Sequence, residues 1–587
     1  MQVLPSCEWI DPPRGNAEAL AKSAGVPLPI ASLLVNRGLV NDPEGLARFL
    51  NPSPVEIGDP FAFPGAGAAA DAIAKAIGAG GEILVFGDYD VDGVTATAIM
   101  ADTISRMGGR ARTFIPNRSE GYGLSDAAIA RCLADGKPSL LVTVDCGITA
   151  GDAVRHFLGL GVEVVVTDHH IPDGSLPDGC VVVSTHAGGV PQTHANMCGA
   201  GVAFMVAAAL TATMHPRPDD TGRRELAAWL DALSIATVAD VVPLTGVNRA
   251  IVSKGLERLN RLPRPGLKML RRQAFQRNVD KITSYHLGMI LAPHINAAGR
   301  VADGGEALKM LLAPDDDTAL EYATRLKNYN STRRNATDEV FKQAEQALAD
   351  KSVFDPESSG AVVAAGEGWT PGVVGIAAGR LCEKWNRPTV LITIDGDGLG
   401  KGSCRAPNGY NIHGALEKVR DVLLQFGGHS NAAGITIRAE RIAELRERLS
   451  RACSEQVGAP YLVPSLEISH WLEAGDVCVE LLEALNKLEP FGQGNPEPCW
   501  GLRGVTIKWA KRVGKDLATG KLKHLSLLLS REDGVELRAV WFNAAELEAK
   551  LDKTRKWDFA GSLSLDDYVG EQSIQMVVTD ARPEGLY

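Results

Sequence analysis

Three apolar runs in the first half of the chain each end in an aspartate. The runs are EILVFGD (82–88), SLLVTVD (139–145) and VEVVVTD (162–168), and helix-like stretches separate them. This alternation is the pattern of a parallel α/β sheet with helices on both faces. Because the carboxyl ends of parallel strands meet at one edge of a sheet, we expect the three aspartates to converge on one crevice.

More acidic and imidazole residues cluster at these strand ends. Burying like charges is costly unless positive charge lies beside them. Any one of these aspartates could instead cap the helix that follows, but capping does not explain paired aspartates beside adjacent histidines. The residues are Asp88, Asp90, Asp92, Asp145, Asp168, His169 and His170. Carboxylate and imidazole without thiolate favour two divalent cations, Mn²⁺ or Mg²⁺, over structural zinc.

A site of this kind predicts hydrolysis of a phosphoester or phosphoanhydride, because paired divalent ions activate water and neutralise a transferring phosphoryl group. The apolar stretch LDALSIATVADVVPL (230–244) supplies a further acidic residue, Asp240. Alone, Asp240 would be an ordinary residue at the end of a helix. In the company of the other acids it becomes a predicted metal ligand.

Composition limits the other classes of function. At 587 residues the chain is long enough for several domains, and its net charge of -11 argues against coating nucleic acid by bulk charge. A local basic track between Lys254 and Lys281 holds nine Lys/Arg against two acidic residues. The alternative interpretation of this track is a solvated helical face.

No sequence feature predicts export or a membrane span. The ten cysteines include no C-x-x-C pair, and the N-terminal residues lack a basic and then apolar leader. The least polar run, 199–214, is shorter than the ~20 residues of a spanning helix and is predicted to be a packed helix. We expect a cytoplasmic protein.

Several motifs carry a resemblance to a known family. GDYDVDG, VTVDCGI, VTDHH and ATVADVVPL resemble the successive motifs of the DHH phosphoesterases. Over most of its length the chain is similar to the bacterial RecJ family of single-strand-specific exonucleases. The further motifs are APHINAAGR (292–300), GWTPGVVGIAAGRL (368–381), KGSCRAPNGYNI (401–412), FGGHSNAAGITI (426–437) and LEPFGQGNPEP (488–498).

The resemblance implies an α/β fold in several parts. These are a parallel-sheet DHH domain, a long connecting helix, a second α/β lobe of DHHA1 type and a C-terminal OB-fold β-barrel. The expected boundaries are 1–70 for an N-terminal helical cap, 71–260 for the metal domain, 261–350 for a basic and helical connector, 351–456 for the second lobe and 465–587 for the barrel.

The resemblance also assigns roles to residues. The expected metal ligands are Asp88, Asp90, Asp92, Asp145, His169 and Asp240, with Asp145 bridging the two ions, Asp168 orienting a histidine and His170 beside the scissile phosphate. The expected substrate contacts are Asn296, Arg300, Ser403, Arg405, Gly427, Gly428 and His429. Alone, the glycines would indicate an ordinary turn and each arginine a surface charge.

The implied activity is metal-dependent degradation of single-stranded DNA to 5′-mononucleotides, 5′ to 3′, in recombination and repair. The implied partners are a single-strand-binding protein and a RecQ-type helicase, with a monomeric chain and no membrane. Two alternatives remain: a phosphodiesterase for short oligonucleotides or cyclic dinucleotides, and a non-catalytic DNA-binding scaffold of the same fold. The presence of every expected ligand argues against the scaffold, and the extra C-terminal domain argues against the small substrates.

Some positions depart from the family pattern. His294 stands where Arg is expected, Thr370 where His is frequent, and Ser184-Thr185 where Asn-Pro is usual. In the C-terminal domain, Trp509 and Trp541 lie among basic residues and predict stacking platforms, with burial in the core as the alternative. The basic residues are Lys508, Lys511, Arg512, Lys515, Lys521 and Lys523.

Overall fold

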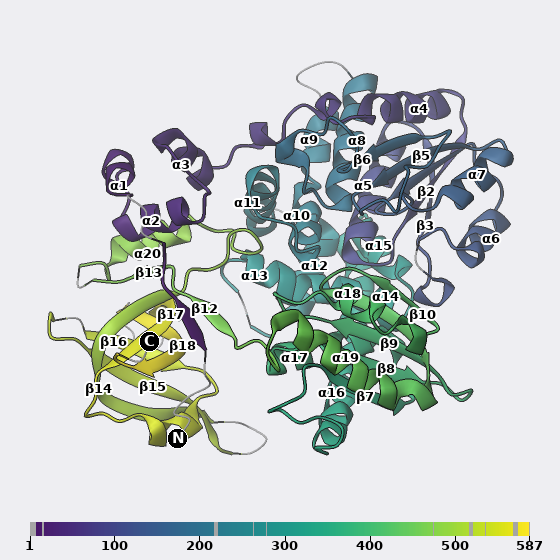
Figure 1. Cartoon of the computed structure of the whole chain (residues 1–587). Helices are drawn as coiled ribbons and strands as arrows, with labels where there is room; N and C mark the ends of the chain where they lie inside the picture. The colour runs from purple at the N-terminus through teal and green to yellow at the C-terminus, as the bar shows by residue number, and fades with distance from the viewer. Residues whose placement is uncertain are drawn as a thin grey trace. The chain divides into compact units, whose positions relative to one another are not determined.

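A computed structural model of the chain (Figure 1) describes residues 7–13, 17–121, 123–215, 221–261, 263–277, 279–473, 475–515, 520–534, 536–566 and 573–585. The chain forms two compact units. One, here the barrel unit, consists of Met1–Gly58, Val241–Lys254 and Pro464–Tyr587. The other, here the two-sheet unit, consists of Asp59–Asp240 and Gly255–Val463.

The first sheet of the two-sheet unit is fully parallel, as predicted. Its strand order is β3-β2-β4-β5-β6. The strands are β2 (Glu82–Gly87), β3 (Arg110–Phe114), β4 (Leu140–Val144), β5 (Glu163–Asp168) and β6 (Val181–Ser184). The edge strand β3 has no apolar run, because four of its five residues are not buried, and the sequence pattern did not reveal it.

Helices cover both faces of this sheet. The β2-to-β3 connection runs along the sheet in the opposite direction from the next two connections, so right-handed crossovers place α5 (Val91–Arg106) on one face and α6 (Asp126–Ala134) and α7 (Gly151–Gly159) on the other. Helix α5 packs against α8 (Gly199–Met214) and α10 (Leu230–Ala239), while α4 (Ala66–Gly78) also packs on α8. The direction reverses between β2 and β4, which makes their carboxyl ends the expected ligand crevice.

A helical segment leads to the second sheet. It comprises α11 (Gly246–Arg261, which begins in the barrel unit), α12 (Pro265–Ala274), α13 (Ser284–His286), the π-helical turn η5 (Leu287–Leu291), α14 (Ala292–Val301) and α15 (Gly305–Leu311). The predicted connecting helix follows as α16 (Asp316–Leu348), 33 residues without Gly or Pro. Asp315 caps it by accepting a hydrogen bond from the Thr318 N–H at 2.8 Å.

The second sheet is mixed, with strand order β10-β11-β9-β8-β7. Only β7 and β8 are parallel. The strands are β7 (Val362–Glu367), β8 (Thr389–Ile394), β9 (Leu399–Arg405), β10 (Gln425–Gly428) and β11 (Ala432–Arg438), and the helices packed on them are α17 (Pro371–Trp385), α18 (Ile412–Glu417) and α19 (Ile442–Val457). The second lobe is therefore α/β, as predicted.

The barrel unit holds the predicted C-terminal barrel. Its strands are β13 (His470–Trp471), β14 (Trp500–Lys515), β15 (Leu522–Ser530), β16 (Glu536–Trp541), β17 (Trp557–Asp566) and β18 (Ser573–Pro583). Pairing of β14 with β17 closes the sheet. The helices α1 (Glu18–Ala24), α2 (Leu28–Asn36), α3 (Pro43–Leu50) and α20 (Val479–Asn486) share one apolar core with the barrel, and β1 (Glu8–Ile10) pairs with β12 (Ser465–Glu467).

Two features of the barrel unit answer questions that the sequence raised. Trp541 is 7% exposed and lies in the core, so the prediction that it is a stacking platform is wrong and the alternative holds. Arg249, on α11, is buried and donates to main-chain carbonyls of the LEPFGQGNPEP motif, including Leu488 O at 2.9 Å and Glu489 O at 3.0 Å. That motif therefore anchors residues 241–254 within the unit.

Among the described residues, no helix is both long and apolar enough for a membrane span.

Candidate active site

The first acidic motif follows β2 at the switch point of the parallel sheet. Asp90 caps α5, because its Oδ1 accepts hydrogen bonds from the main-chain N–H groups of Asp92 at 2.9 Å and Gly93 at 3.1 Å. Asp88 is buried, and its Oδ1 has no hydrogen-bond partner among the described residues. The helix-cap interpretation therefore holds for Asp90, which is also an expected ligand, but it does not account for the unpaired oxygen of Asp88.

Asp92 is fixed by a helix that the sequence did not connect with the site. Its Oδ2 accepts from the Gly199 N–H at 2.7 Å and its Oδ1 from the Ala200 N–H at 2.9 Å, both at the start of α8. A helix N-terminus favours a carboxylate. Gly199 admits no side chain, since a Cβ there would lie 2.3 Å from Asp145 Oδ1. The start of α8 therefore holds Asp92 and lies directly against Asp145.

Asp145 directly follows β4 in a strained conformation. Its φ of 59° lies in the left-handed region, which non-glycine residues seldom adopt and which often marks functional sites. Its buried Oδ1 has no hydrogen-bond partner among the described residues and lies 3.2 Å from His169 Nε2. This backbone geometry directs the carboxylate into the cluster.

His169 lies among three carboxylates. Besides Asp145, its Nε2 lies 3.8 Å from Asp92 Oδ2, and its Nδ1 lies 3.6 Å from Asp240 Oδ2. The main-chain oxygen of His169 accepts from Thr185 Oγ1 at 3.3 Å and from His186 Nε2 at 3.1 Å. Burial lowers the pKa of His169, which favours the neutral imidazole that binds metals.

Asp168 orients the second histidine. Its Oδ1 accepts from the main-chain N–H groups of His169 at 2.8 Å and His170 at 3.1 Å and from His170 Nδ1 at 2.8 Å, while its Oδ2 accepts from the Ile148 N–H at 2.9 Å. Burial works against the Asp168 carboxylate, but these hydrogen bonds lower its pKa overall. An Asp168 with this many partners is suited to supporting His170.

The ligand-type atoms fall into three overlapping groups, in each of which all atoms lie within 4.8 Å of one another: Asp88, Asp90 and Asp145; Asp92, His169 and Asp240; Asp145, His169 and His170. Burial and then the neighbouring aspartates raise the pKa of Asp88 to about 8 and that of Asp240 to about 9. Burial and the aspartates also raise the pKa of Asp145. In the absence of added positive charge these carboxyls therefore resist ionisation, and a cation bound among them would favour their charged forms.

Divalent cations fit this cluster. Three buried oxygens, Asp88 Oδ1, Asp145 Oδ1 and Asp240 Oδ2, lack hydrogen-bond partners among the described residues. Their neighbours are carboxylates and imidazoles without a thiolate ligand, which is the donor set of Mn²⁺ and Mg²⁺. Asp145 and His169 each belong to two of the three groups, so they are placed to contact more than one ion.

A cluster of arginines lies in the same unit. Burial and then the charges of Arg118 and Arg333 lower the pKa of Arg300 to about 10, and Arg405 adds to the effect. The structure fixes three of the guanidinium groups on main-chain oxygens: Arg118 Nε donates to Gly299 O at 3.2 Å, Arg300 to Gly372 O at 3.1 Å and Arg405 to Cys404 O at 2.7 Å. None of the four forms an ion pair with a carboxylate in the described parts of the chain. Guanidinium groups without carboxylate partners are suited to binding an anion.

Two other predicted substrate contacts, Asn296 and Ser403, are bonded to other parts of the site. Asn296 Oδ1 accepts from the Val91 N–H at 2.7 Å, so its oxygen supports the first turn of α5. Ser403 Oγ accepts from Arg405 at 3.3 Å and lies within the arginine cluster. Both residues therefore act on other parts of the site through these contacts.

Gly427, Gly428 and His429 lie at the hairpin between β10 and β11. Gly428 has φ +136°, and a Cβ there would lie 2.5 Å from Ala432 O, so the turn itself requires glycine. Around Gly427 a Cβ would meet nothing within 4 Å, and the His429 side chain is exposed. The ordinary-turn interpretation thus explains Gly428, and the exposed pair beside it offers a surface to a ligand.

The departures from the family pattern also have places in the structure. His294 is buried between α14 and α16, where Nδ1 donates to Ile290 O at 2.7 Å and Nε2 accepts from Asn330 at 3.2 Å. Ser184 Oγ accepts from the His186 N–H at 3.1 Å, and Thr185 bonds to His169 O. Thr370 precedes α17 and makes no side-chain cap. Ser184 and Thr185 thus support the histidine motif.

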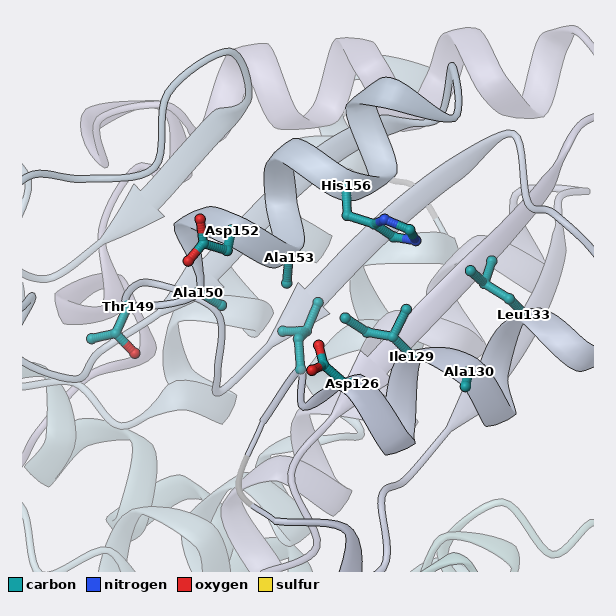
Figure 2. A pocket seen from close by; sticks show the side chains of 10 residues that line it. Asp126, Ile129, Ala130, Leu133, Thr149, Ala150, Asp152, Ala153 and His156 are labelled. Carbon is teal, nitrogen blue, oxygen red and sulfur yellow. The ribbon is translucent and has the colours of Figure 1, made fainter. Parts of the chain in front are cut away.

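A groove of about 530 Å³ lies between α6 and α7, the two helices that cover one face of the first sheet (Figure 2). Leu124, Ile129, Leu133 and Ala153 give it apolar walls, with Asp126, Asp152 and His156 among the side chains around it. None of the three ligand groups includes any of these residues. The groove is therefore distinct from the acidic cluster.

Sequence reasoning did not find Gly199, Ala200, Arg118 or His186 as parts of the site. Gly199 and Ala200 act through main-chain N–H groups, which leave no side-chain signal. Arg118 follows β3, the strand that the sequence pattern did not reveal. Arg333 was expected from the sequence, together with Arg325, Lys327 and Arg334, as a cation that the connecting helix contributes at the groove between the lobes.

The similarity to known proteins extends over nearly the whole chain. Residues 82–237 match the DHH family N-terminal domain, residues 358–455 the DHHA1 domain and residues 468–580 the RecJ OB domain. The chain is 33% identical over 576 residues to the single-stranded-DNA-specific exonuclease RecJ of Bacillus subtilis (strain 168), which covers 97% of this chain and 70% of that protein.

Solved structures agree with the sequence relationship. The crystal structure of RecJ from Thermus thermophilus in complex with Mn²⁺ superposes with a TM-score of 0.80 at 28% identity, covering 98% of this chain and 79% of that one. The complex of that protein with Mg²⁺ gives a TM-score of 0.75 at 27% identity, covering 98% and 78%. The chain belongs to the RecJ family of single-stranded-DNA-specific exonucleases.

Proposed function

We propose that this chain degrades single-stranded DNA from its 5′ end to 5′-mononucleotides by hydrolysing phosphodiester bonds, in DNA recombination and repair. The observation that carries the proposal is the pairing of two opposite clusters in one unit. Buried carboxylates with unpaired oxygens gather at the strand ends, and arginines without carboxylate partners gather nearby. Divalent ions and substrate phosphates are the complementary species.

The metal-binding role falls to the six predicted ligands. Asp88 and Asp90 with Asp145 would hold one Mn²⁺ or Mg²⁺, and His169 and Asp240 with Asp92 would hold a second, with Asp145 close to both groups. Divalent ions in such a site supply Lewis acidity and lower the pKa of a water nucleophile. The protein fixes the ligands by the α5 cap, the start of α8 and the left-handed backbone at Asp145.

His170 is proposed to act on the substrate directly. Burial disfavours its protonated form, but the hydrogen bond and charge of Asp168, helped by Asp92 and Asp90, raise its pKa overall. A protonated imidazole beside a phosphodiester can donate to a phosphoryl oxygen. The contact to Asp168 holds the Nδ1 proton and leaves the ring in a fixed orientation.

The arginine cluster is proposed to hold substrate phosphate. Arginine presents planar, forked donors that match phosphate oxygens. Arg300 and Arg405 are oriented by main-chain carbonyls, so they need little further ordering when an anion arrives. Gly427 and His429, exposed on the β10–β11 hairpin, would contact the strand beyond this point.

The barrel supports a strand-binding role of its own. Strand register places Trp509 opposite Leu528, Lys511 opposite Ser526 and Leu528 opposite Arg538 on the outward face of β14, β15 and β16. Phe542 is 54% exposed and packs edge-on against His524 at 5.1 Å. Aromatic rings among cations are the stacking surface used for single strands. We infer that Trp509 and Phe542 stack with bases in place of the buried Trp541.

Digestion of end-labelled DNA tests the proposed function. Single-stranded DNA labelled at one end or the other is incubated with Mn²⁺ or Mg²⁺, with duplex DNA and short oligonucleotides in parallel. We expect immediate release of a 5′ label as mononucleotide and slow cutting of duplex. Release of the 3′ label first would overturn the direction, cleavage of two- to five-mers only would establish the short-oligonucleotide phosphodiesterase, and intact bound DNA would establish the scaffold.

The remaining expectations are also proposals. We propose a cytoplasmic monomer that works with a single-strand-binding protein and a RecQ-type helicase. Sedimentation tests the monomer, and digestion of strands coated by a single-strand-binding protein tests the partnership. A dimer in solution would contradict the monomer, and complete inhibition by the coating protein would contradict the partnership.

A further inference from the structure

A basic hollow of about 310 Å³ lies in the two-sheet unit, at the end of α12 and in the loop after it. Its lining residues are Lys268, Arg271, Arg272, Phe275, Gln276, Arg277 and Val279. Four of the seven are cations and none is acidic, although the chain as a whole carries a net charge of -11. It lies in the second half of the basic track between Lys254 and Lys281, and the proposed catalytic chemistry uses none of its lining residues.

Two of the four cations build the wall. The Lys268 ammonium pairs with the Asp316 carboxylate at the start of α16. Arg271 donates to Val279 O at 2.5 Å and so ties the loop back to its helix. Arg272 and Arg277 are exposed, and neither has a hydrogen bond or ion pair with any residue that the structure describes. These two guanidinium groups are available to an anion.

An aromatic ring lies between the cations. Phe275 is half-buried, and its ring packs against that of His286 with centroids 5.5 Å apart and planes tilted by 60°. The contact with α13 fixes the ring at the wall of the hollow. A face of cations that served only solubility would not need an ordered ring among them. Cations around a fixed ring are the combination that binds the phosphates and bases of single strands.

We propose that this hollow is an auxiliary binding site for single-stranded nucleic acid, separate from the acidic cluster. A strand presents one phosphate and one base per nucleotide, so it can satisfy Arg272, Arg277 and the Phe275 ring together. A carboxylate-rich peptide would satisfy the cations but leave the ring without a planar partner. The proposal rests on the proposed function for its class of ligand and adds a second point at which a long substrate is held.

Binding to strands of two lengths tests the site. The full chain is titrated, in EDTA to prevent cleavage, with labelled oligo(dT) of about 5 and about 40 nucleotides, since a short strand spans few subsites. The variant is Arg272→Glu/Arg277→Glu. The matched control is Lys342→Glu/Lys351→Glu, which makes the same change in charge at exposed positions of the same unit.

We expect the arginine variant to lose at least about tenfold in affinity for the long strand and to keep its affinity for the short one. Losing two phosphate contacts lowers the salt dependence of the long-strand binding by about 1.4 in log-log slope. Phe275→Ala is expected to lose about fivefold with an unchanged slope, because stacking releases no counterions. The lysine control should bind both strands as the native chain does.

Two results would overturn the proposal. If the arginine variant lost equal affinity for both strand lengths, the hollow would lie on the path to the metals. If that variant kept the native affinity and salt slope for the long strand but lost binding to poly-glutamate, the hollow would be a site for acidic peptides. The proposed function fails separately, if the native chain binds the long strand but cuts it with neither Mn²⁺ nor Mg²⁺.

Discussion

The acidic cluster and the arginine cluster of the two-sheet unit are opposite solutions to one electrostatic problem. Each gathers like charges that repel, most of them at buried or partly buried positions. Burial and then repulsion raise the pKa of Asp88 in the acidic cluster to about 8, and burial and then repulsion lower the pKa of Arg300 in the arginine cluster to about 10. The clusters offset each other only in part, through Arg118 acting on Asp88 and Asp90 acting on Arg300, so we propose that each takes up a ligand of opposite sign.

The two clusters differ in how the fold positions them. The acids follow parallel strands and are fixed through main-chain groups, as when the start of α8 holds Asp92. The arginines come from a short 3-10 helix, two α-helices and an antiparallel strand, and three of the four long side chains reach main-chain carbonyls and so become ordered. A metal site needs rigid short ligands, whereas a site for a moving strand can use longer ones.

The largest expected effect follows the loss of one acid. Asp145→Asn keeps the size of the side chain and a residue type that tolerates positive φ, but removes the charge shared by two ligand groups. We expect the nuclease rate to fall more than about 100-fold, beyond the usual cost of changing a supporting residue. Thermal stabilisation by added Mn²⁺ should be lost as well.

The control for this variant is Asp152→Asn, seven residues on, whose side chain is 98% exposed. It should keep both activity and metal stabilisation. If Asp145→Asn kept the stabilisation by Mn²⁺, Asp145 would not be a metal ligand. The acidic cluster would then not depend on a bound cation in the way that the comparison requires.

Loss of an arginine should separate the two clusters. Arg405→Gln removes a charged donor, and hydrogen bonds to charged groups contribute about 1.5–3 kcal/mol, so KM for single-stranded DNA should rise about 10- to 150-fold. Mn²⁺ stabilisation should remain. Arg380→Gln, an exposed arginine paired with Asp338 in the same lobe, is the matched control and should change neither quantity. Loss of metal stabilisation in Arg405→Gln would show that the clusters are not independent.

The sequence predicts the acidic cluster well because two rules act together. Apolar runs mark parallel strands, and parallel strands put their carboxyl ends at one edge. Those two rules are enough to place Asp88, Asp145 and Asp168 at the same edge of the sheet. They do not reveal that Asp168 is already fully hydrogen-bonded, which distinguishes a supporting residue from a ligand.

The arginine cluster is harder to predict because no periodic pattern places its members. Arg300 and Arg405 were found through motif resemblance, whereas Arg118 and Arg333 had no such signal. The barrel teaches the same lesson. Trp541 is the last residue of β16, and the alternation along that strand places it on the buried face, whereas Phe542 follows the strand and is exposed. A shift of one residue in the register of β16 would turn Trp541 outward.

Asp168→Asn tests whether support can be separated from ligation. An amide cannot accept all of the hydrogen bonds that Asp168 receives, so His170 should lose its fixed orientation. We expect activity to fall about 10- to 100-fold, with a smaller effect on Mn²⁺ stabilisation. Because the Asp168 carboxylate raises the pKa of His170, its loss should lower that pKa and move the alkaline limb of the rate profile to lower pH. If the alkaline limb of the rate profile did not move, His170 would not be the group whose titration sets that limb.

The smallest expected effect concerns Thr185, one of the residues that depart from the family pattern. Thr185→Val keeps the shape of a buried side chain but removes the 3.3 Å hydrogen bond to His169 O, while His186 still donates to the same oxygen. Since one neutral hydrogen bond contributes about 1 kcal/mol, activity should fall about fivefold at most. The control is Thr324→Val, which removes a side-chain hydrogen bond to the main-chain carbonyl of Leu320 at an exposed position of α16 and should have no effect on activity. A loss as large as that of Asp145→Asn would mean that the His169 main chain, and not the buried charge alone, sets the geometry of the acidic cluster.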